Sequence, residues 1–256
     1  MHFDRYVGID YSGAKTPESR LKALQVYAGS PQGEVQKVLP PSSASKSIQW
    51  SRRRIAEWIV ELTQSDVRFL AGIDHCFSLP ISYFRRYGLS SWDAFLEDFI
   101  AHWPAHVPGV SMEGLLKEPP DRLGQPGELR LAEGWTQAAK SVFVFQGAGS
   151  VGKASFAGIP WLHFIRKRAG DTVHFWPFDG WQLPEGKPVI LEAYPALCKR
   201  RYSRNGRTSD EHDAYSLATW LRDMDARDAL DRYSRPPLTP AEKETAALEG
   251  WIFGVT

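Results

Sequence analysis

The chain has 256 residues, of which 43% are apolar and 24% are charged, and its formal net charge is +1. This length and composition are those of an ordinary globular protein, organised as one domain with an insertion or as two small domains. The near-neutral charge excludes the overall basicity of many duplex-binding proteins. Any nucleic-acid site must therefore depend on a local basic patch.

Three features bear on the compartment in which the protein works. The chain has two cysteines, Cys76 and Cys198, which make no disulfide framework and favour a reducing compartment. The N-terminus runs almost directly into a predicted strand, which leaves no room for a signal peptide. No apolar run approaches the roughly 20 residues that cross a bilayer. We therefore expect a cytoplasmic protein without a membrane partner.

The first part of the chain predicts four strands and one helix. Residues 5–10 alternate apolar with small or polar side chains, which is the period of a strand. Residues 21–27 and 34–39 predict two further strands joined by a turn-rich connection. A helix is predicted over residues 47–63, and it leads into a strand that ends at Asp74.

The middle of the chain is irregular and rich in tryptophan. Residues 80–170 predict a helical insertion, with helices at 91–102 and 156–169. A short strand is predicted over residues 172–178, and the apolar run at 188–191 predicts another.

The C-terminal part predicts a long helix over residues 210–233 and a short one over residues 240–248. Strands that alternate with helices are typical of an α/β fold, in which a helical crossover makes the strands it joins parallel. We predict a single domain over residues 1–256, with the insertion between its fourth and fifth core strands.

Four acidic residues stand at the ends of predicted elements. Asp10, Asp74 and Glu192 each end a strand, and Asp213 lies in the first turns of the helix that begins near residue 210. Ligands of α/β sheets gather at the carboxyl ends of parallel strands, and neighbouring strands lie about 4.8 Å apart. Mg²⁺ and Mn²⁺ prefer carboxylate and water oxygens. The sequence therefore predicts a divalent-metal site, although each acid could also be a simple strand-end or helix-capping residue.

Basic residues close to these acids are candidates for binding a phosphate backbone. The segment from residue 199 to residue 207 supplies Lys199, Arg200, Arg201, Arg204 and Arg207. Residues 147–153 nearly form a P-loop, but Ala154 stands where the magnesium-binding Ser or Thr belongs. A nucleotide-binding P-loop, a looser phosphate-holding role for Lys153, and a plain connection are the alternatives for this segment.

A family resemblance runs through these motifs. The segments VGIDYSGA, AGIDHCFSLP, VILEAYPA, DEHDAYSLA and EGWIFGV resemble the motif series of a bacterial and archaeal family described as predicted RNase-H-like nucleases (domain of unknown function four-two-nine). The resemblance covers most of the chain, from residue 7 to residue 255. It implies a ribonuclease H-like mixed sheet of order 3-2-1-4-5 flanked by helices, in which the strands ending in Asp10 and Asp74 are neighbours. His75 and Cys76 stand where small or proline residues are expected.

The same resemblance implies metal-dependent phosphodiester cleavage, with Asp10, Asp74, Glu192 and Asp213 at the family's acidic positions. Two hard cations can stabilise the attacking and leaving oxygens of such a hydrolysis. We expect Asp10 to bridge two ions, Asp74 and Glu192 to complete one site, and Asp213 the other. The partner would be a nucleic acid or a small nucleotide.

Two other functions fit the same residues. Gly8-Ile9-Asp10 followed by Ser12-Gly13 also resembles the first phosphate loop of actin-like ATPases and sugar kinases, so a nucleotide-binding phosphotransferase of the actin-like or P-loop-like kind is one alternative. A catalytically inactive RNase H-like binding protein with a degenerate metal site is the other.

Overall fold

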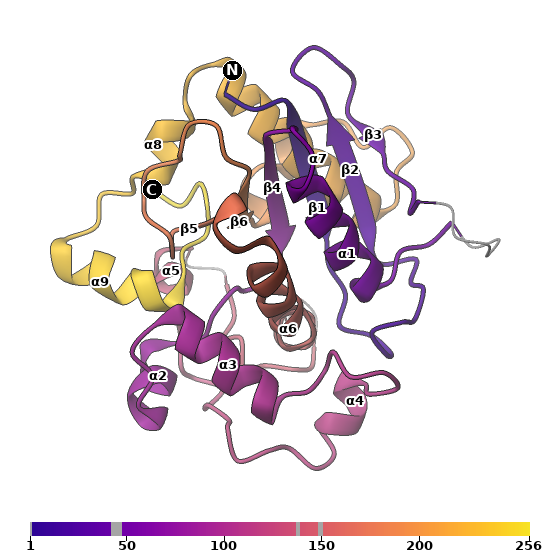
Figure 1. The fold of residues 1–256 in the computed structure, drawn as a ribbon. Helices are drawn as coiled ribbons and strands as arrows, with labels where there is room; N and C mark the ends of the chain where they lie inside the picture. Colours follow the sequence, from indigo (N-terminus) through magenta and orange to yellow (C-terminus); the bar gives the residue numbers. More distant parts are fainter. Residues whose placement is uncertain (1, 42–47, 137–138, 148–150) are drawn as a thin grey trace.

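The computed structural model describes residues 2–41, 48–136, 139–147 and 151–256. Within these residues the chain has an α/β fold, with a mixed six-stranded sheet between layers of helices (Figure 1). The strands are β1 (Arg5–Asp10), β2 (Gln25–Gly29), β3 (Gln36–Lys37), β4 (Phe69–Asp74), β5 (His174–Trp176) and β6 (Val189–Glu192), in the order β3-β2-β1-β4-β6-β5. β1, β4, β6 and β5 run parallel, whereas β2 is antiparallel to both of its neighbours.

The helices of the described residues are α1 (Arg52–Thr63), α2 (Ile81–Tyr87), α3 (Trp92–His102), α4 (Met112–Leu115), α5 (Leu131–Thr136), α6 (Gly152–Ala169), α7 (Ser209–Ala226), α8 (Leu230–Ser234) and α9 (Pro240–Glu249). Short 3₁₀ turns are η1 (Gly170–Thr172), η2 (Pro195–Leu197) and η3 (Lys199–Arg201). The predicted helix over residues 210–233 is two helices, because the chain turns at Asp228, which has a positive φ of 54°. None of the described helices is both long and apolar enough to cross a membrane.

The period of the strands divides the core between the two faces of the sheet. Val7 and Ile9 of β1 belong to the apolar cluster that contains residues of α1 and α6. Tyr6 belongs to the cluster that contains Leu217 and Leu221 of α7. The residues that share the phase of Tyr6, which include Gly8 and Asp10, therefore face α7.

The predicted strand order 3-2-1-4-5 differs from the observed order in one respect. β5 pairs with the outer edge of β6, so the strand next to β4 is the sixth in the chain and not the fifth. The sequence analysis predicted a strand at residues 172–178 but assigned it no place in the sheet. The pairing of β5 with β6 is a tertiary contact that local periodicity does not encode.

The predicted helical insertion does not form a separate body. α6 packs against α1 and α3, and Trp92, Phe95 and Phe99 of α3 lie in the same apolar cluster as Ile9 and Ile73 of the sheet. Pro160 lies inside α6, which continues through it. The region between β4 and β5 therefore covers one face of the sheet and contributes to its core.

The N-terminal segment is attached to the end of α7 by a buried carboxylate. Asp225 accepts hydrogen bonds from the backbone N–H groups of His2 and Phe3, from the His2 ring and from the Tyr6 hydroxyl. Burial alone raises the pKa of Asp225, but the hydrogen bonds from Tyr6 and His2 outweigh it and leave the pKa below its ordinary value. The ionised form of Asp225 therefore stabilises the fold.

Candidate functional site

Two of the predicted acids lie side by side at the carboxyl edge of the sheet. β1 and β4 are parallel neighbours, and their register pairs Asp10 with Asp74. The prediction that these strands are adjacent is thus confirmed. The repeated Gly-Ile-Asp tripeptides align residue by residue, so both carboxylates have the same phase and face the helix α7.

Glycine at position 8 allows α7 to approach this edge closely. A Cβ atom added to Gly8 would lie 2.1 Å from the backbone oxygen of Ala214 and 2.6 Å from the nitrogen of Ala218. No side chain other than hydrogen fits between strand and helix at this point. The contact fixes the first turns of α7, and with them Asp213, over the end of β1.

α7 itself begins in a well-defined way. The Thr208 hydroxyl accepts a hydrogen bond from the Glu211 N–H, and the Glu211 carboxylate accepts one from the Thr208 N–H. This capping box satisfies two backbone donors that the first turn leaves unpaired. The helix start is therefore held rigidly one turn before Asp213.

Asp10, Asp74 and Asp213 form what we name the acid cluster. The pKa of Asp10 is raised to about 9, first by burial and then by the charges of Asp74, Asp210 and Asp213, against a lowering by Lys199. The pKa of Asp74 is raised to about 7, first by burial and then by the charge of Asp213. These carboxylates are thus crowded and only partly compensated, and a bound cation would restore their ionised forms.

The two carboxylate oxygens of Asp213 differ in their hydrogen bonding. Lys199 of η3 donates from Nζ to Asp213 Oδ2 at 2.9 Å. Asp213 Oδ1 is buried and has no hydrogen-bond partner in the described part of the chain. A buried, unpaired carboxylate oxygen is unusual in a native structure. In the acid cluster it is a donor atom that a hard divalent cation would satisfy.

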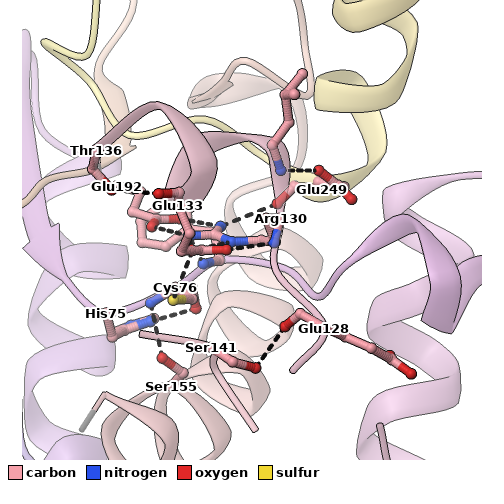
Figure 2. A network of polar contacts seen from close by, with 12 residues as sticks. His75, Cys76, Glu128, Arg130, Glu133, Thr136, Ser141, Ser155, Glu192 and Glu249 are labelled. Carbon is pink, nitrogen blue, oxygen red and sulfur yellow. Dashed lines mark hydrogen bonds and ion pairs between the residues drawn. The ribbon is translucent and has the colours of Figure 1, made fainter. Parts of the chain in front are cut away.

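Glu192 lies close to the acid cluster but differs from it in phase. The register of β6 pairs Glu192 with Ile73, and Leu191 with Gly72, so Ala193 and not Glu192 is level with Asp74. Both Glu192 oxygens are occupied. Arg130 donates to them at 2.5 Å and 2.7 Å, and the Phe77 N–H donates to Oε2 at 2.9 Å (Figure 2).

Arg130 is the centre of a buried network that the sequence analysis missed. Its Nε and its backbone N–H donate to Glu133, and Nη1 also donates to the backbone oxygen of Glu249 (Figure 2). The Glu249 carboxylate accepts from the N–H groups of Ile81 and Leu131. We name Arg130, Glu133, Glu192 and Glu249 the Arg130 network. It joins β6, α5 and α9, segments that no local sequence pattern connects.

The predicted basic residues are divided among several positions. Lys199, Arg200 and Arg204 line a pocket of about 310 Å³ next to Asp213. Arg201 is exposed. Arg207 lies over the Tyr215 ring at 3.4 Å from its centroid and donates to the backbone of its own loop, so it holds the loop in shape.

Lys153 makes an ion pair with Glu113 at 3.2 Å, and its backbone packs against Gly13, where an added Cβ would lie 2.0 Å from the Lys153 oxygen. The near-P-loop and the loop that follows β1 therefore meet. Residues 148–150 of the near-P-loop lie outside the described residues.

A second pocket of about 320 Å³ opens between the acid cluster and the Arg130 network. Asp74, Asp213 and Lys199 line one part of it, and Arg130 and Glu133 line another. Among the described residues, no three His, Cys, Asp or Glu side chains are already gathered in a metal-binding arrangement. The oxygen donors of the acid cluster, the free Asp213 oxygen and the raised pKa values nevertheless fit a divalent cation chemically.

No family model, curated protein or solved structure matches the chain. The resemblance to the family of RNase-H-like nucleases stays a prediction. The function must therefore be inferred from the geometry and charge of the site itself.

Proposed function

We propose that this protein is a divalent-metal-dependent nuclease with a ribonuclease H-like fold. The observation that carries the proposal is the register of β1 and β4, which sets Asp10 beside Asp74 under α7. Together with Asp213, these residues supply three carboxylates at the carboxyl edge of parallel strands, where α/β proteins bind their ligands. The strand order β3-β2-β1-β4-β6, with β2 antiparallel, supports the ribonuclease H-like assignment, and β5 is then an addition at the edge.

Asp10, Asp74 and Asp213 are the residues that would hold the metal, Mg²⁺ or Mn²⁺. When bound, a divalent cation stabilises the negative charge that develops on the phosphate and its leaving oxygen. Glu192 was predicted as a fourth ligand. In the proposal Glu192 does not bind the metal directly. Its oxygens accept hydrogen bonds from Arg130 and from the Phe77 N–H, and these bonds fix the segment that follows Asp74.

The substrate would be bound by the cations beside the acid cluster. Lys199, Arg200 and Arg204 lie close to Asp213 and would contact phosphate oxygens of the backbone. In the reaction, a water oxygen bonds to phosphorus, the bond from phosphorus to the leaving sugar oxygen breaks, and a proton from the water passes to the leaving oxygen.

The test is an assay of the purified protein with Mn²⁺ or Mg²⁺ and single-stranded, duplex and hybrid oligonucleotides. We expect metal-dependent cleavage of at least one substrate. Asp10→Asn and Asp213→Asn should each reduce it about 10²-fold or more, which is the scale for removing one electrostatic group from an active site. Asp66→Asn, at an exposed aspartate, is the matched control and should retain activity. Full activity of Asp10→Asn would refute the assignment.

Thermal stabilisation separates this proposal from the kinase-like alternative. A nuclease site should be stabilised by Mn²⁺ alone, because a ligand that binds only the folded state raises the melting temperature. Stabilisation that requires ATP and does not occur with Mn²⁺ would favour the phosphotransferase. Stabilisation by Mn²⁺ without cleavage of any oligonucleotide would favour the inactive binding protein.

A further inference from the structure

The 320 Å³ pocket has an open side and a closed side. Its open side is at Lys199, whose side chain is 37% exposed. Lys140, which also lines the pocket, is exposed as well. At the closed side the pocket is lined by Arg130 and Glu133, whose side chains are 0% and 2% exposed. The Glu192 side chain, which also lines the pocket, is 5% exposed. The pocket therefore ends against the Arg130 network.

The closed side has few groups left for recognising a charged ligand. Arg130 uses its Nε and both terminal nitrogens in bonds to Glu133, Glu192 and the backbone of residue 249. A phosphate that reached this depth would meet the Glu133 and Glu192 carboxylates and no unused arginine donor. Charge repulsion and the lack of donors exclude a phosphate from the inner part of the pocket.

The remaining walls suit a flat, weakly polar body. Ala154, Ala193, Pro195 and Ile252 line the pocket with apolar surface, and Tyr11 adds an aromatic ring. Bases stack on aromatic rings and enter apolar pockets of this size class, about 300–1,000 Å³. Lysines at the open side would meet phosphate oxygens. Polarity therefore changes from cationic at the rim to apolar along the walls.

We infer that this pocket receives a single nucleotide unit, with its base and sugar inside and its phosphate at the acid cluster. A strand that continued past the cleavage point would need a second opening, and in the described part of the chain the buried Arg130 network closes the inner end of the pocket. The substrate is then the end of a nucleic-acid strand or a free nucleotide, and not the interior of a continuous chain. This inference rests on the proposed function and specifies its substrate.

The first experiment compares a linear single-stranded oligonucleotide with a covalently closed circle of the same sequence, each with the wild-type protein and Mn²⁺. We expect mononucleotides from the linear strand and at least about tenfold slower cleavage of the circle. Equal cleavage of both would overturn the inference and leave the proposed nuclease activity standing. If the substrate is a free nucleotide, a nucleoside monophosphate or triphosphate should be hydrolysed instead of the linear strand, and absence of metal-dependent cleavage of all these substrates would refute the proposed function.

A binding measurement tests the pocket whether or not cleavage is seen. A fluorescent linear oligonucleotide is titrated with protein and competed with the unlabelled linear strand, the circle, a nucleoside monophosphate or a nucleoside triphosphate. Competition by the linear strand but not the circle supports a strand end, and competition by the free nucleotides at least as strong as that of the linear strand supports a small nucleotide. Equal competition by circle and linear strand, or no binding of any of these probes, overturns the inference.

Ala196→Trp is the variant that blocks the pocket. Ala196 lines the pocket and is exposed, so a large side chain can be placed there without entering the core. Ala101→Trp, at an exposed position of α3, is the matched control. We expect Ala196→Trp to weaken binding of the linear strand or free nucleotide at least about tenfold, with Mn²⁺ stabilisation and melting temperature unchanged. Equal binding by the two variants would contradict the inference.

Discussion

Removal of the Arg130 side chain tests the role of the network behind the site. In Arg130→Met the apolar stem is kept, but Glu133 and Glu192 lose the cation that compensates them in a buried environment. Breaking a buried ion pair by removing one partner costs about 3–5 kcal/mol. In a chain of this length about 4 kcal/mol corresponds to a fall in melting temperature of about 10 °C.

A double-mutant cycle isolates the pair itself. Glu192→Gln should lower the free energy of unfolding by less than Arg130→Met does, because Arg130 then keeps Glu133 as its partner. In the double variant Arg130→Met, Glu192→Gln, only the Glu133 carboxylate is left uncompensated. The two single variants together should therefore lose about 1–3 kcal/mol more free energy of unfolding than the double variant loses. Urea unfolding followed by circular dichroism measures all three variants. A loss below about 1 kcal/mol for Arg130→Met, or strict additivity, would refute the account of Glu192 as a partner of Arg130.

Three further predictions concern stability. In a metal-free solution with chelator, Asp10→Asn should raise the free energy of unfolding by about 1–3 kcal/mol near pH 8, since burial and the neighbouring carboxylate charges together raise the folded-state pKa of Asp10 to about 9. A folded-state pKa above the unfolded value means that stability is lost as pH rises, so thermal melts of the two proteins should converge near pH 4. Gly8→Ala should prevent folding or lower the free energy of unfolding by more than about 3 kcal/mol, because its Cβ would lie 2.1 Å from the Ala214 oxygen. Gly72→Ala, whose nearest contact would be at 3.0 Å, should lower it clearly less. Soluble yield and melting temperature measure both effects. Asp225→Asn should cost about 2 kcal/mol at pH 7. Because the hydrogen bonds from Tyr6 and His2 lower the folded-state pKa of Asp225, this difference should shrink as pH falls below about 4 towards the lowered pKa, and a difference that stayed constant from pH 7 down to about pH 2 would contradict it.

The adjacency of the strands that end in Asp10 and Asp74, which was predicted and is confirmed, involves a repeated tripeptide. Gly-Ile-Asp occurs twice at the end of a predicted strand, and two identical tripeptides in a parallel pair align with the same phase. Asp213 could be placed near them only through the fold implied by the resemblance. The structure then supplies a local reason, the contact of Gly8 with the backbone of α7.

The position of Glu192 depends on register, which the sequence does not contain. Residue 192 ends an apolar run in the same way as Asp10 and Asp74 end theirs. A shift of one residue in register exchanges the two faces of a strand, and β6 is paired so that Leu191, not Glu192, shares the phase of Asp74. The Arg130 network was missed for a related reason: residues 118–134 have the composition of a loop, and a buried arginine there is recognisable only from the carboxylates that reach it through space.

The two neighbouring groups of carboxylates differ in how their charge is balanced. In the Arg130 network, the guanidinium and several backbone N–H groups satisfy the oxygens of Glu133, Glu192 and Glu249. In the acid cluster, among the residues that the structure describes, Lys199 pairs with Asp213, the other Asp213 oxygen has no hydrogen-bond partner, and the pKa values of Asp10 and Asp74 are raised. A bound cation can compensate carboxylates that the chain itself leaves uncompensated. For this reason a cation is expected at Asp10, Asp74 and Asp213 and not at Glu192, although all four acids end or begin an element at the same edge of the sheet.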